Sequence, residues 1–507
     1  MSAESAISSF DMAPLYTSWL RTIIDSQQSA AENKDCDPSS PIFPDCDGAD
    51  TDTSPHVAGL FGNRPADPSW GAALDVLFDL VLRYYNRADF AENNYAALTA
   101  YADYLLRIAD VEGVSNRRPT GRPATTAAAI PHNLTSSTFP PPQKQLATFH
   151  YYGDWLEPNQ VPSTEDVSRQ TSAFNFLRSL RVVINAAAVL GHADDAELYT
   201  GRYLVSAAAY NAAFFNVSGA GCYGSGRQNE QVFPAYLSIV PGGDAAVPAF
   251  VERCLLPAIA ANATHVDTGI ISTKYLMPLL TRTGHVAVAL QLALNEDFPS
   301  WAAMSLVFNQ STITEHWNPV SNPSGNEMSS RNHPAFGSVG SWLYQALLGV
   351  RLGDAASADF YVPGLPPGEQ APGGRAPQDG YGYSRAVVAP EIVDDARLPG
   401  ASGGTWTVAG WVGASWALSA GGAALELNAS FPVSTLGEVR TPGGGAWGPT
   451  HVTITDVASG AAVWAAGAFA PGVAGVFGGA ACGLGGDRVC LAVGSGDFAF
   501  RVTASSR

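Results

Sequence analysis

The segment SAFNFLRSLRVVINAAAVLGHADDAELYTGRYLVSAAAYNAAF, residues 172–214, decides the fold. Apolar residues recur at helical spacing on both sides of GHADD, so we predict two helices, near Ser172–Leu190 and Asp195–Phe214. A connection this short makes the second helix run back along the first. Consecutive antiparallel pairs of this kind build an (α/α) toroid or a helical solenoid. The sequence shows no repeat of fixed length, which argues against the solenoid.

The same spacing extends over the first 350 residues, and a different pattern follows. Further helices are predicted over residues 12–27, 72–85, 95–110, 245–261, 269–280, 285–295 and 339–350. Residues 362–382 are rich in Pro and Gly and predict a linker. Beyond it, stretches such as TWTVAGWVGASWALS, residues 405–419, alternate apolar and polar positions and predict strands over 383–507. We therefore expect a helical domain over 1–361 and an antiparallel β-sandwich over 383–507.

Composition narrows the classes of partner. The chain has 507 residues, 46% of them hydrophobic, and a formal net charge of −18. An acidic surface repels phosphate backbones and anionic lipid heads, so neither nucleic acid nor a membrane surface is expected as a partner. No segment approaches the roughly 18–20 apolar residues of a transmembrane helix. A neutral small molecule or glycan fits better, and the oligomeric state stays open.

Cysteines and glycosylation sequons indicate the cellular compartment in which the protein is located. The six cysteines fall into three near-neighbour pairs, Cys36 with Cys46, Cys222 with Cys254 and Cys482 with Cys490. Such pairs suit short-loop disulfides, and buried free thiols are the alternative. Asn-X-Ser/Thr triplets occur at Asn133, Asn216, Asn262, Asn309 and Asn428. Together these features favour a secreted or lumenal protein, although the N-terminal MSAESAISSFDMAPLY lacks the basic and apolar parts of a signal peptide.

Aromatic, acidic and histidine residues gather in six segments between the predicted helices. In chain order they are WGAA (70–73), YGDWL (152–156), HVDTGIISTKYL (265–276), FPSWAAM (298–304), TITEHWN (312–318) and NHPAFGSVGSWLY (332–344). Indole faces pack on the C–H face of a pyranose and carboxylates accept bonds from its hydroxyl groups, so this composition suits a sugar site.

Each residue taken alone also has an ordinary structural interpretation. A lone Trp such as Trp70 or Trp155 could cap a helix end as a core aromatic. Glu315 would by default be a solvated surface residue, and His333 could sit at a helix entry. Asp267 could be a helix N-cap. The order of the motifs therefore carries more information than any single residue.

In that order the motifs resemble the α-L-rhamnosidases of glycoside hydrolase family 78. The resemblance implies an (α/α)6 barrel followed by a β-sandwich, and hydrolysis of terminal α-L-rhamnose with inversion, without a metal ion or other cofactor. Glu315 matches the general base of the family, and His333 matches a histidine that contacts the sugar. Trp70 and Trp155 match aromatics that line the rhamnose pocket. Asp154, grouped with these substrate-binding residues, is expected to support the pocket wall.

The sequence departs from the family pattern in several places. The usual Trp-Glu-Arg-Trp-Asp around the base reads TEHWN here, residues 314–318, and the usual Trp-Gly-Asp reads WGA, residues 70–72. Ser272 stands where Gly is common. These differences bear on affinity and substrate preference.

The largest departure concerns the general acid. The family carries it in a Cys-Pro…Arg-Gly-Trp…Gly-Asp-Ala segment, which by motif order would end just before Met1. We therefore expect a fragment, whose barrel is incomplete at the N-terminus and lacks its first helix and its acid. Glu4 and Asp11 both fall after that segment and are not assigned the role.

Two alternatives remain open. Without its acid, the chain could be a catalytically incompetent glycan-binding fragment. It could also be a six-hairpin glycosidase with a different sugar specificity. The aglycone and the linkage preference are not determined by the sequence.

Overall fold

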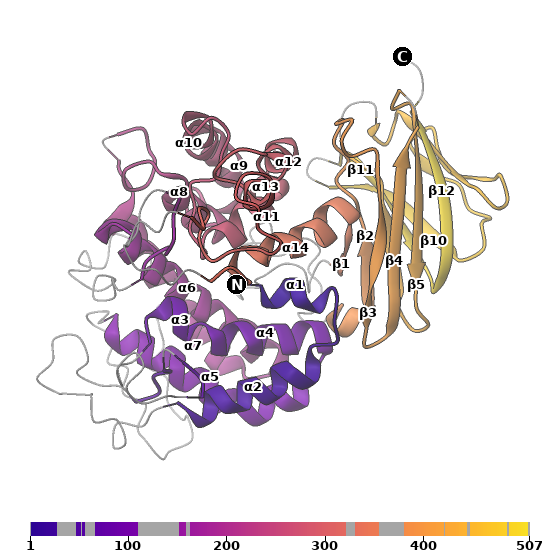
Figure 1. Ribbon diagram of the computed structural model, residues 1–507. Coiled ribbons are helices and arrows are strands. Elements are labelled where there is room, and N and C mark those ends of the chain that lie inside the picture. Colours follow the sequence, from indigo (N-terminus) through magenta and orange to yellow (C-terminus); the bar gives the residue numbers. More distant parts are fainter. Residues whose placement is uncertain are drawn as a thin grey trace, which may run out of the picture.

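The computed structural model has a helical domain followed by a β-domain (Figure 1). It describes residues 2–27, 47–51, 53–55, 66–109, 152–158, 163–217, 219–320, 330–353, 380–419, 421–443, 447–483 and 486–504. The predicted Cys36–Cys46 pair, the sequon at Asn133 and residues 362–379 of the predicted linker lie outside these ranges.

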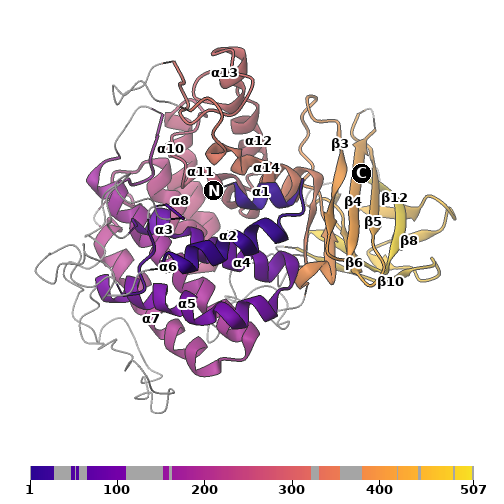
Figure 2. The same cartoon turned by 60° about the horizontal axis from the view of Figure 1, so that its bottom comes forward.

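Two views show the helices gathered into one body beside the β-domain (Figures 1 and 2). The described α-helices are α1 (Ala3–Ile7), α2 (Ala13–Asp25), α3 (Pro68–Gly71), α4 (Ala73–Tyr85), α5 (Ala88–Ile108), α6 (Glu165–Leu190), α7 (Ala193–Phe214), α8 (Gln228–Tyr236), α9 (Val247–Phe250), α10 (Leu256–Ala261), α11 (Thr273–Arg282), α12 (Val286–Leu294), α13 (Trp301–Leu306) and α14 (Val339–Trp342). Shorter 3-10 and π segments are η1 (Asp244–Ala246), η2 (Val251–Leu255), η3 (Ala335–Ser338), η4 (Leu343–Leu348) and η5 (Tyr381–Tyr383).

The α6–α7 pair confirms the helical hairpin predicted from residues 172–214. The hydroxyl of Thr164 accepts a bond from the backbone N–H of Val167 at 3.3 Å and begins α6. Gly191, at φ 81°, ends it in the left-handed conformation that glycine adopts without strain. Helix α6 is long and apolar enough to span a membrane by length and composition alone, but 83% of its most apolar window is buried inside the protein. That burial is what a core helix shows.

The short helices α3 and α13 fall in segments predicted to lie between helices. Three further parts of the helical prediction were wrong, each for a physical reason. The nine-residue helix α8 was not predicted because all its residues are buried, which removes the amphipathic signal. Helix α1 was not predicted because five residues carry too little periodicity. Residues 339–350 do not form one helix: α14 passes into the π segment η4, and Gly349, at φ 88°, ends it before a strand.

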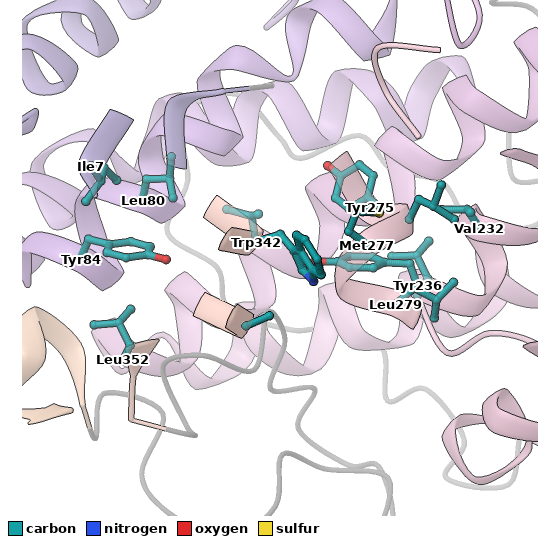
Figure 3. Packing of buried hydrophobic residues seen from close by; sticks show 14 of the residues in the cluster. Ile7, Leu80, Tyr84, Val232, Tyr236, Tyr275, Met277, Leu279, Trp342 and Leu352 are labelled. Atoms are coloured by element: carbon teal, nitrogen blue, oxygen red, sulfur yellow. The ribbon is translucent and has the colours of Figure 1, made fainter. Parts of the chain in front are cut away.

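The helical core is rich in aromatic side chains (Figure 3). The close-up places Trp342 between a group that includes Tyr84 and a group that includes Tyr236 and Tyr275. The rings of Tyr236 and Tyr275 lie 4.5 Å apart between centroids. The indole N–H of Trp342 donates to the hydroxyl of Thr281 at 2.8 Å, so its one polar atom is satisfied in the core.

The β-domain consists of two stacked sheets (Figure 1). One has the order β1-β2-β6-β11-β10 and the other β3-β4-β5-β12-β7-β8-β9. The strands are β1 (Val350–Leu352), β2 (Arg385–Val388), β3 (Gly400–Thr407), β4 (Gly410–Leu418), β5 (Ala424–Phe431), β6 (Leu436–Arg440), β7 (Val452–Asp456), β8 (Ala462–Ala465), β9 (Ala468–Phe469), β10 (Val476–Cys482), β11 (Arg488–Val493) and β12 (Gly496–Ala504).

The predicted strand-rich domain is confirmed, with one difference in pairing. All described pairs are antiparallel except β2 with β6, which run parallel. Strand β1 precedes the predicted linker and pairs with β2, which follows it. The first sheet is therefore built partly by the chain that leaves the helical domain, and the exact division at 362–382 stays a prediction.

Side chains of the β-domain bond to backbone carbonyls of the helical domain where η4 and α1 meet β3 and β4. The indole N–H of Trp416 donates to the carbonyl of Leu347 at 2.7 Å, and the hydroxyl of Thr405 donates to the carbonyl of Ile7 at 3.4 Å. Figure 2 shows α1 beside α14, close to this boundary. Helix α1 thus packs at the boundary between the two domains.

Glu4 on α1 is the charged residue that ties this helix to the barrel. Its carboxylate accepts bonds from the hydroxyl of Tyr84 at 2.6 Å and the amide of Gln345 at 3.2 Å, with Lys274 Nζ at 3.9 Å. Burial acts to raise the pKa of Glu4, but Lys274, Arg83 and these hydrogen bonds together hold it below its ordinary value. The carboxylate is therefore accommodated as an ion.

The described cysteines form two disulfides. Cys222 pairs with Cys254, and Cys482 pairs with Cys490 across the β10–β11 hairpin. Two of the three predicted pairs are thereby confirmed, and disulfides of this kind fit an extracellular enzyme.

Candidate functional site

Three aromatic rings from two distant segments meet near α3. The carboxylate of Asp67 accepts a bond from the backbone N–H of Ser69 at 2.8 Å, which begins α3 and fixes Trp70 one residue later. The ring of Trp70 lies 4.2 Å from that of Tyr152 and 6.5 Å from that of Trp155, edge-on, between centroids. Both indoles are half-buried. The structure thus brings together Trp70 and Trp155, and adds Tyr152, to which the sequence analysis assigns no role.

Asp154 anchors the segment that carries two of these rings. Its fully buried carboxylate accepts bonds from the backbone N–H groups of Gly269 and Ser272, both at 2.7 Å. It also accepts from the Ser272 hydroxyl at 2.5 Å and the Asn229 amide at 3.1 Å. Burial raises the pKa of Asp154, and these four hydrogen bonds oppose the rise. The carboxylate faces donors on α8 and on the 264–272 segment, so it holds the segment with Tyr152 and Trp155 in place. A direct role of Asp154 in ligand binding stays a prediction.

The backbone around Asp154 is held in a strained conformation. Gly153, Trp155 and Leu156 have φ of 64°, 43° and 61°, which is unusual for the two non-glycine residues. The backbone N–H of Ile270 donates to the carbonyl of Trp155 at 2.9 Å. A Cβ on Gly269 would lie 1.8 Å from the carbonyl oxygen of Asp154, so only glycine fits there. The two segments are therefore interlocked at backbone level, and the orientation of Trp155 depends on that contact.

A second buried carboxylate, that of Glu157, lies near the end of the same segment, residues 152–158. It accepts a bond from the Ser163 hydroxyl at 2.6 Å and forms an ion pair with Arg227, whose guanidinium also pairs with Asp267 at 3.2 Å. Burial raises the pKa of Glu157 to about 7, with the charge of Asp154 adding to the rise and Arg227 opposing it. A general acid needs a shift of this kind. The side chain of Glu157 is fully buried and bound to Arg227, however, so it links loops rather than facing a ligand.

Polar side chains at the start of α8 join these loops, and sequence reasoning missed them. The amide of Gln228 donates to the carbonyl of His265 at 2.8 Å and accepts from the backbone N–H of Asp267 at 2.9 Å. Asn229 reaches Asp154, as described above. The available signal was RQNEQ, residues 227–231: five polar residues directly before an apolar run, with Glu230 accepting from the backbone N–H of Arg227 at 2.9 Å.

Glu315 lies on a segment paired to the one that carries His333. The backbone N–H of Glu315 donates to the carbonyl of Ser330 at 2.9 Å, and the N–H of Ser330 donates to Glu315 Oε2 at 2.8 Å. The N–H of His333 donates to the carbonyl of Ile313 at 2.9 Å. His316 is near both: burial lowers its pKa, the charge of Glu315 opposes this and that of His333 adds to it. The structure thus brings Glu315 and His333 together, with Glu315 half-buried.

The 264–272 segment connects the segment of Glu315 to the aromatic group, which consists of Trp70, Tyr152 and Trp155. The buried Trp317 donates its indole N–H to the carbonyl of Thr268 at 2.9 Å, and its ring packs at a tilt against Phe336 with centroids 4.1 Å apart. The next residue, Gly269, is the one bonded to Asp154. Asp154, Trp155 and Glu315 therefore lie on segments linked by one hydrogen-bonded framework. Trp70 joins it through ring contacts with Tyr152 and Trp155, and His333 through its backbone bond to Ile313. Among the described residues no cluster of three or more His, Cys, Asp or Glu side chains could hold a metal ion.

Asp154→Asn should destabilise the protein by at least about 2 kcal/mol. The amide NH₂ group would then face N–H and O–H donors, where the carboxylate oxygen accepts their hydrogen bonds. Urea denaturation followed by tryptophan fluorescence measures the change in stability. Asp166→Asn is the matched control, since the Asp166 side chain is 71% exposed; it should change stability by less than about 0.5 kcal/mol. Equal stability of Asp154→Asn and wild type would contradict the anchoring role.

Glu157 should make stability depend on pH. Its pKa in the folded protein is about 7 against an ordinary 4.5, so folding favours the protonated form. As pH rises through this window the unfolded chain loses its proton first, and the free energy of unfolding falls. Relative to Glu157→Gln, which does not titrate, wild type should lose stability between these two values and change no further above them. A difference that is constant with pH would overturn the assignment.

Comparison with known proteins shows the family and the fold of the chain. The family model described as the bacterial alpha-L-rhamnosidase 6 hairpin glycosidase domain matches residues 1–120 and 136–347. An alpha-L-rhamnosidase of Streptomyces avermitilis is 29% identical over 372 residues, which is 72% of this chain and 30% of that protein. One from Alteromonas sp. (strain LOR) is 24% identical over 303 residues, 58% of this chain and 29% of that protein. The chain therefore spans about 30% of the length of these relatives.

Solved structures show the same fold. An alpha-L-rhamnosidase from Dictyoglumus thermophilum superposes with a TM-score of 0.72 at 23% identity, covering 99% of this chain and 45% of that one. The Streptomyces avermitilis alpha-L-rhamnosidase complexed with L-rhamnose gives a TM-score of 0.69 at 24% identity, covering 99% and 37%. The interlocked loops, the domain order and the match to the family model over more than half of the sequence lead to one conclusion: the chain belongs to the alpha-L-rhamnosidase family of six-hairpin glycosidases.

Proposed function

We propose that the protein hydrolyses terminal α-L-rhamnose from rhamnosides with inversion at the anomeric carbon, and that Glu315 is the general base. The observation that carries this is the setting of the Glu315 carboxylate. The N–H of Ser330 donates to Oε2 at 2.8 Å, which fixes the orientation of the group. Among the described residues no group bonds Oε1, so that oxygen is available to a water molecule.

In an inverting hydrolysis two carboxyl groups act from opposite faces of the sugar. One, a role to which no described residue is assigned, protonates the glycosidic oxygen as the bond to the aglycone breaks. The other, here Glu315, removes a proton from the water that attacks the anomeric carbon. Product rhamnose then has the β configuration. His333, close to Glu315 on the paired segment, would bind a sugar hydroxyl group.

The aromatic group would supply the rest of the binding energy. Half-buried Trp70 and Trp155 stand edge-on to one another, so they present two apolar walls at a steep angle. Such walls suit the C–H face and the C6 methyl group of rhamnose. The relative from Streptomyces avermitilis that was solved with L-rhamnose supports this choice of sugar. The substrate would be a rhamnose-containing glycan or glycoside outside the cytosol, consistent with the two disulfides.

A second candidate is glycan binding without turnover. In the described loops next to Glu315, the carboxylates of Asp154, Glu157 and Asp267 are all bound to protein groups. None of the three is placed to protonate a leaving oxygen. Trp70, Trp155 and His333 would still bind rhamnose, because contacts from two indoles and an imidazole do not depend on an acid.

Glu315→Gln should lower turnover of para-nitrophenyl α-L-rhamnoside by about 10²–10⁴-fold while L-rhamnose still binds, because the amide keeps the shape but cannot accept the proton. Release of para-nitrophenol measures turnover, calorimetry measures binding, and proton NMR of the first-formed sugar should show the β anomer. Glu252→Gln is the matched control, since Glu252 is exposed on η2.

Normal turnover by Glu315→Gln, or a first-formed α anomer, would contradict the proposed mechanism. Binding of L-rhamnose by wild type without any turnover would establish the second candidate instead. A panel of other para-nitrophenyl glycosides separates rhamnose from different sugars.

A further inference from the structure

Two exposed tryptophans face each other at the tip of the β3–β4 hairpin. Trp406 and Trp411 are directly opposite in the strand register, with ring centroids 5.6 Å apart. Trp406 is 72% exposed and Trp411 39%. Thr405 on β3 and Trp416, five residues after Trp411 on β4, point to the other face of the sheet, where they contact the helical domain. The alternation of a strand therefore turns the two indoles away from that domain, onto the outer face.

The indole of Trp411 lies flat on this outer face. Gly404 and Gly413 are opposite one another one step further along the two strands. A Cβ on Gly404 would lie 2.5 Å from Cζ2 of Trp411, and one on Gly413 would lie 2.6 Å from its Nε1. The ring thus rests on bare backbone, and a side chain at either glycine would lift it. One face of the indole is left as a platform.

A polar groove of about 400 Å³ adjoins the platform. The next row across the strands consists of Ser402, Ser415 and Asn428, and the amide of Asn428 donates to the Ser415 hydroxyl at 2.9 Å. The row beyond it holds Gly400, Ala417 and Glu426. Small residues form the floor, while hydroxyl, amide and carboxylate groups stand beside it. Pockets of this volume accept small ligands.

We propose that this face is a second saccharide-binding site, separate from the loops around Glu315 and independent of the function proposed for them. The C–H face of a pyranose would stack on Trp411, with Trp406 alongside. Ser402, Ser415 and Asn428 would bind its hydroxyl groups.

Charge favours a neutral sugar over other ligands. Glu426 stands in the groove with Arg501 opposite it on β12, so the two charges offset each other. The chain as a whole carries −18, which disfavours phosphate-rich ligands and anionic lipid. A row of hydroxyl and amide groups beside one aromatic platform is also more polar than the centre of a protein interface.

Asn428 belongs to a sequon, and an N-linked glycan there would fill the same groove. The test therefore uses the full 507-residue chain produced in a host without N-glycosylation. Native gel electrophoresis is run in gels that contain soluble xyloglucan, mixed-linkage β-glucan, galactomannan or rhamnogalacturonan. At least one polysaccharide should retard wild type, and Trp411→Ala should weaken that binding about tenfold or more.

Three variants separate this site from other causes. Gly413→Val keeps both indoles but lifts Trp411, and should also weaken binding. Phe477→Ala removes a side chain that is 70% exposed on β10 of the other sheet, and should leave binding unchanged. Trp155→Ala removes a ring from the aromatic cluster of the helical domain, and this variant should still be retarded.

The proposal is overturned if no polysaccharide retards wild type, or if Trp411→Ala is retarded equally. If Trp155→Ala is no longer retarded while Trp411→Ala is retarded like wild type, binding takes place in the helical domain instead. A change of oligomeric state in Trp411→Ala without saccharide, seen by size-exclusion chromatography, would make this face a contact between copies and would also overturn the proposal.

Discussion

The buried carboxylate of Asp154 is the interaction on which the rest of the candidate site depends. An ionised group inside a protein is tolerated only when its oxygens are satisfied. Here four donors from α8 and the 264–272 segment do so. The hydrogen bonds to this one carboxylate therefore hold three separate segments, residues 152–158, α8 and residues 264–272, in fixed positions relative to one another. Trp155 follows Asp154 directly and takes its left-handed conformation from this anchor.

The framework extends from that carboxylate to Glu315 by short steps. Gly269, bonded to Asp154, follows Thr268, whose carbonyl accepts the indole N–H of Trp317. Trp317 lies two residues beyond Glu315. Catalytic groups on loops need a rigid support, because errors of about 1 Å cost much of the rate. The buried hydrogen bonds supply that support, while Trp70, Trp155 and Glu315 themselves stay half-buried and accessible.

The sequence predicts the strongly periodic elements well and the buried polar ones poorly. Helices α4, α6 and α7 and the strand-rich domain follow from apolar spacing. Helix α8 does not, since every residue in it is buried, and the parallel pairing of β2 with β6 joins strands far apart in sequence. The site segments could be named from motif order. The anchoring geometry of Asp154, Gln228 and Asn229 could not, because it depends on which backbone donors the fold brings within 3 Å or so. The orientation of the Trp411 ring, flat on the sheet, depends on Gly404 and Gly413, which are paired across two strands. Sequence periodicity does not show that these glycines lie under an indole.

The central claim is that Trp70, Trp155, His333 and Glu315 enclose one sugar. A crystal structure of the protein soaked with L-rhamnose tests it most directly. The account predicts a pyranose against the two indoles, with its anomeric carbon facing Glu315 Oε1 across one water molecule. A rhamnose bound away from Trp155, or with its anomeric carbon turned from Glu315, would contradict it.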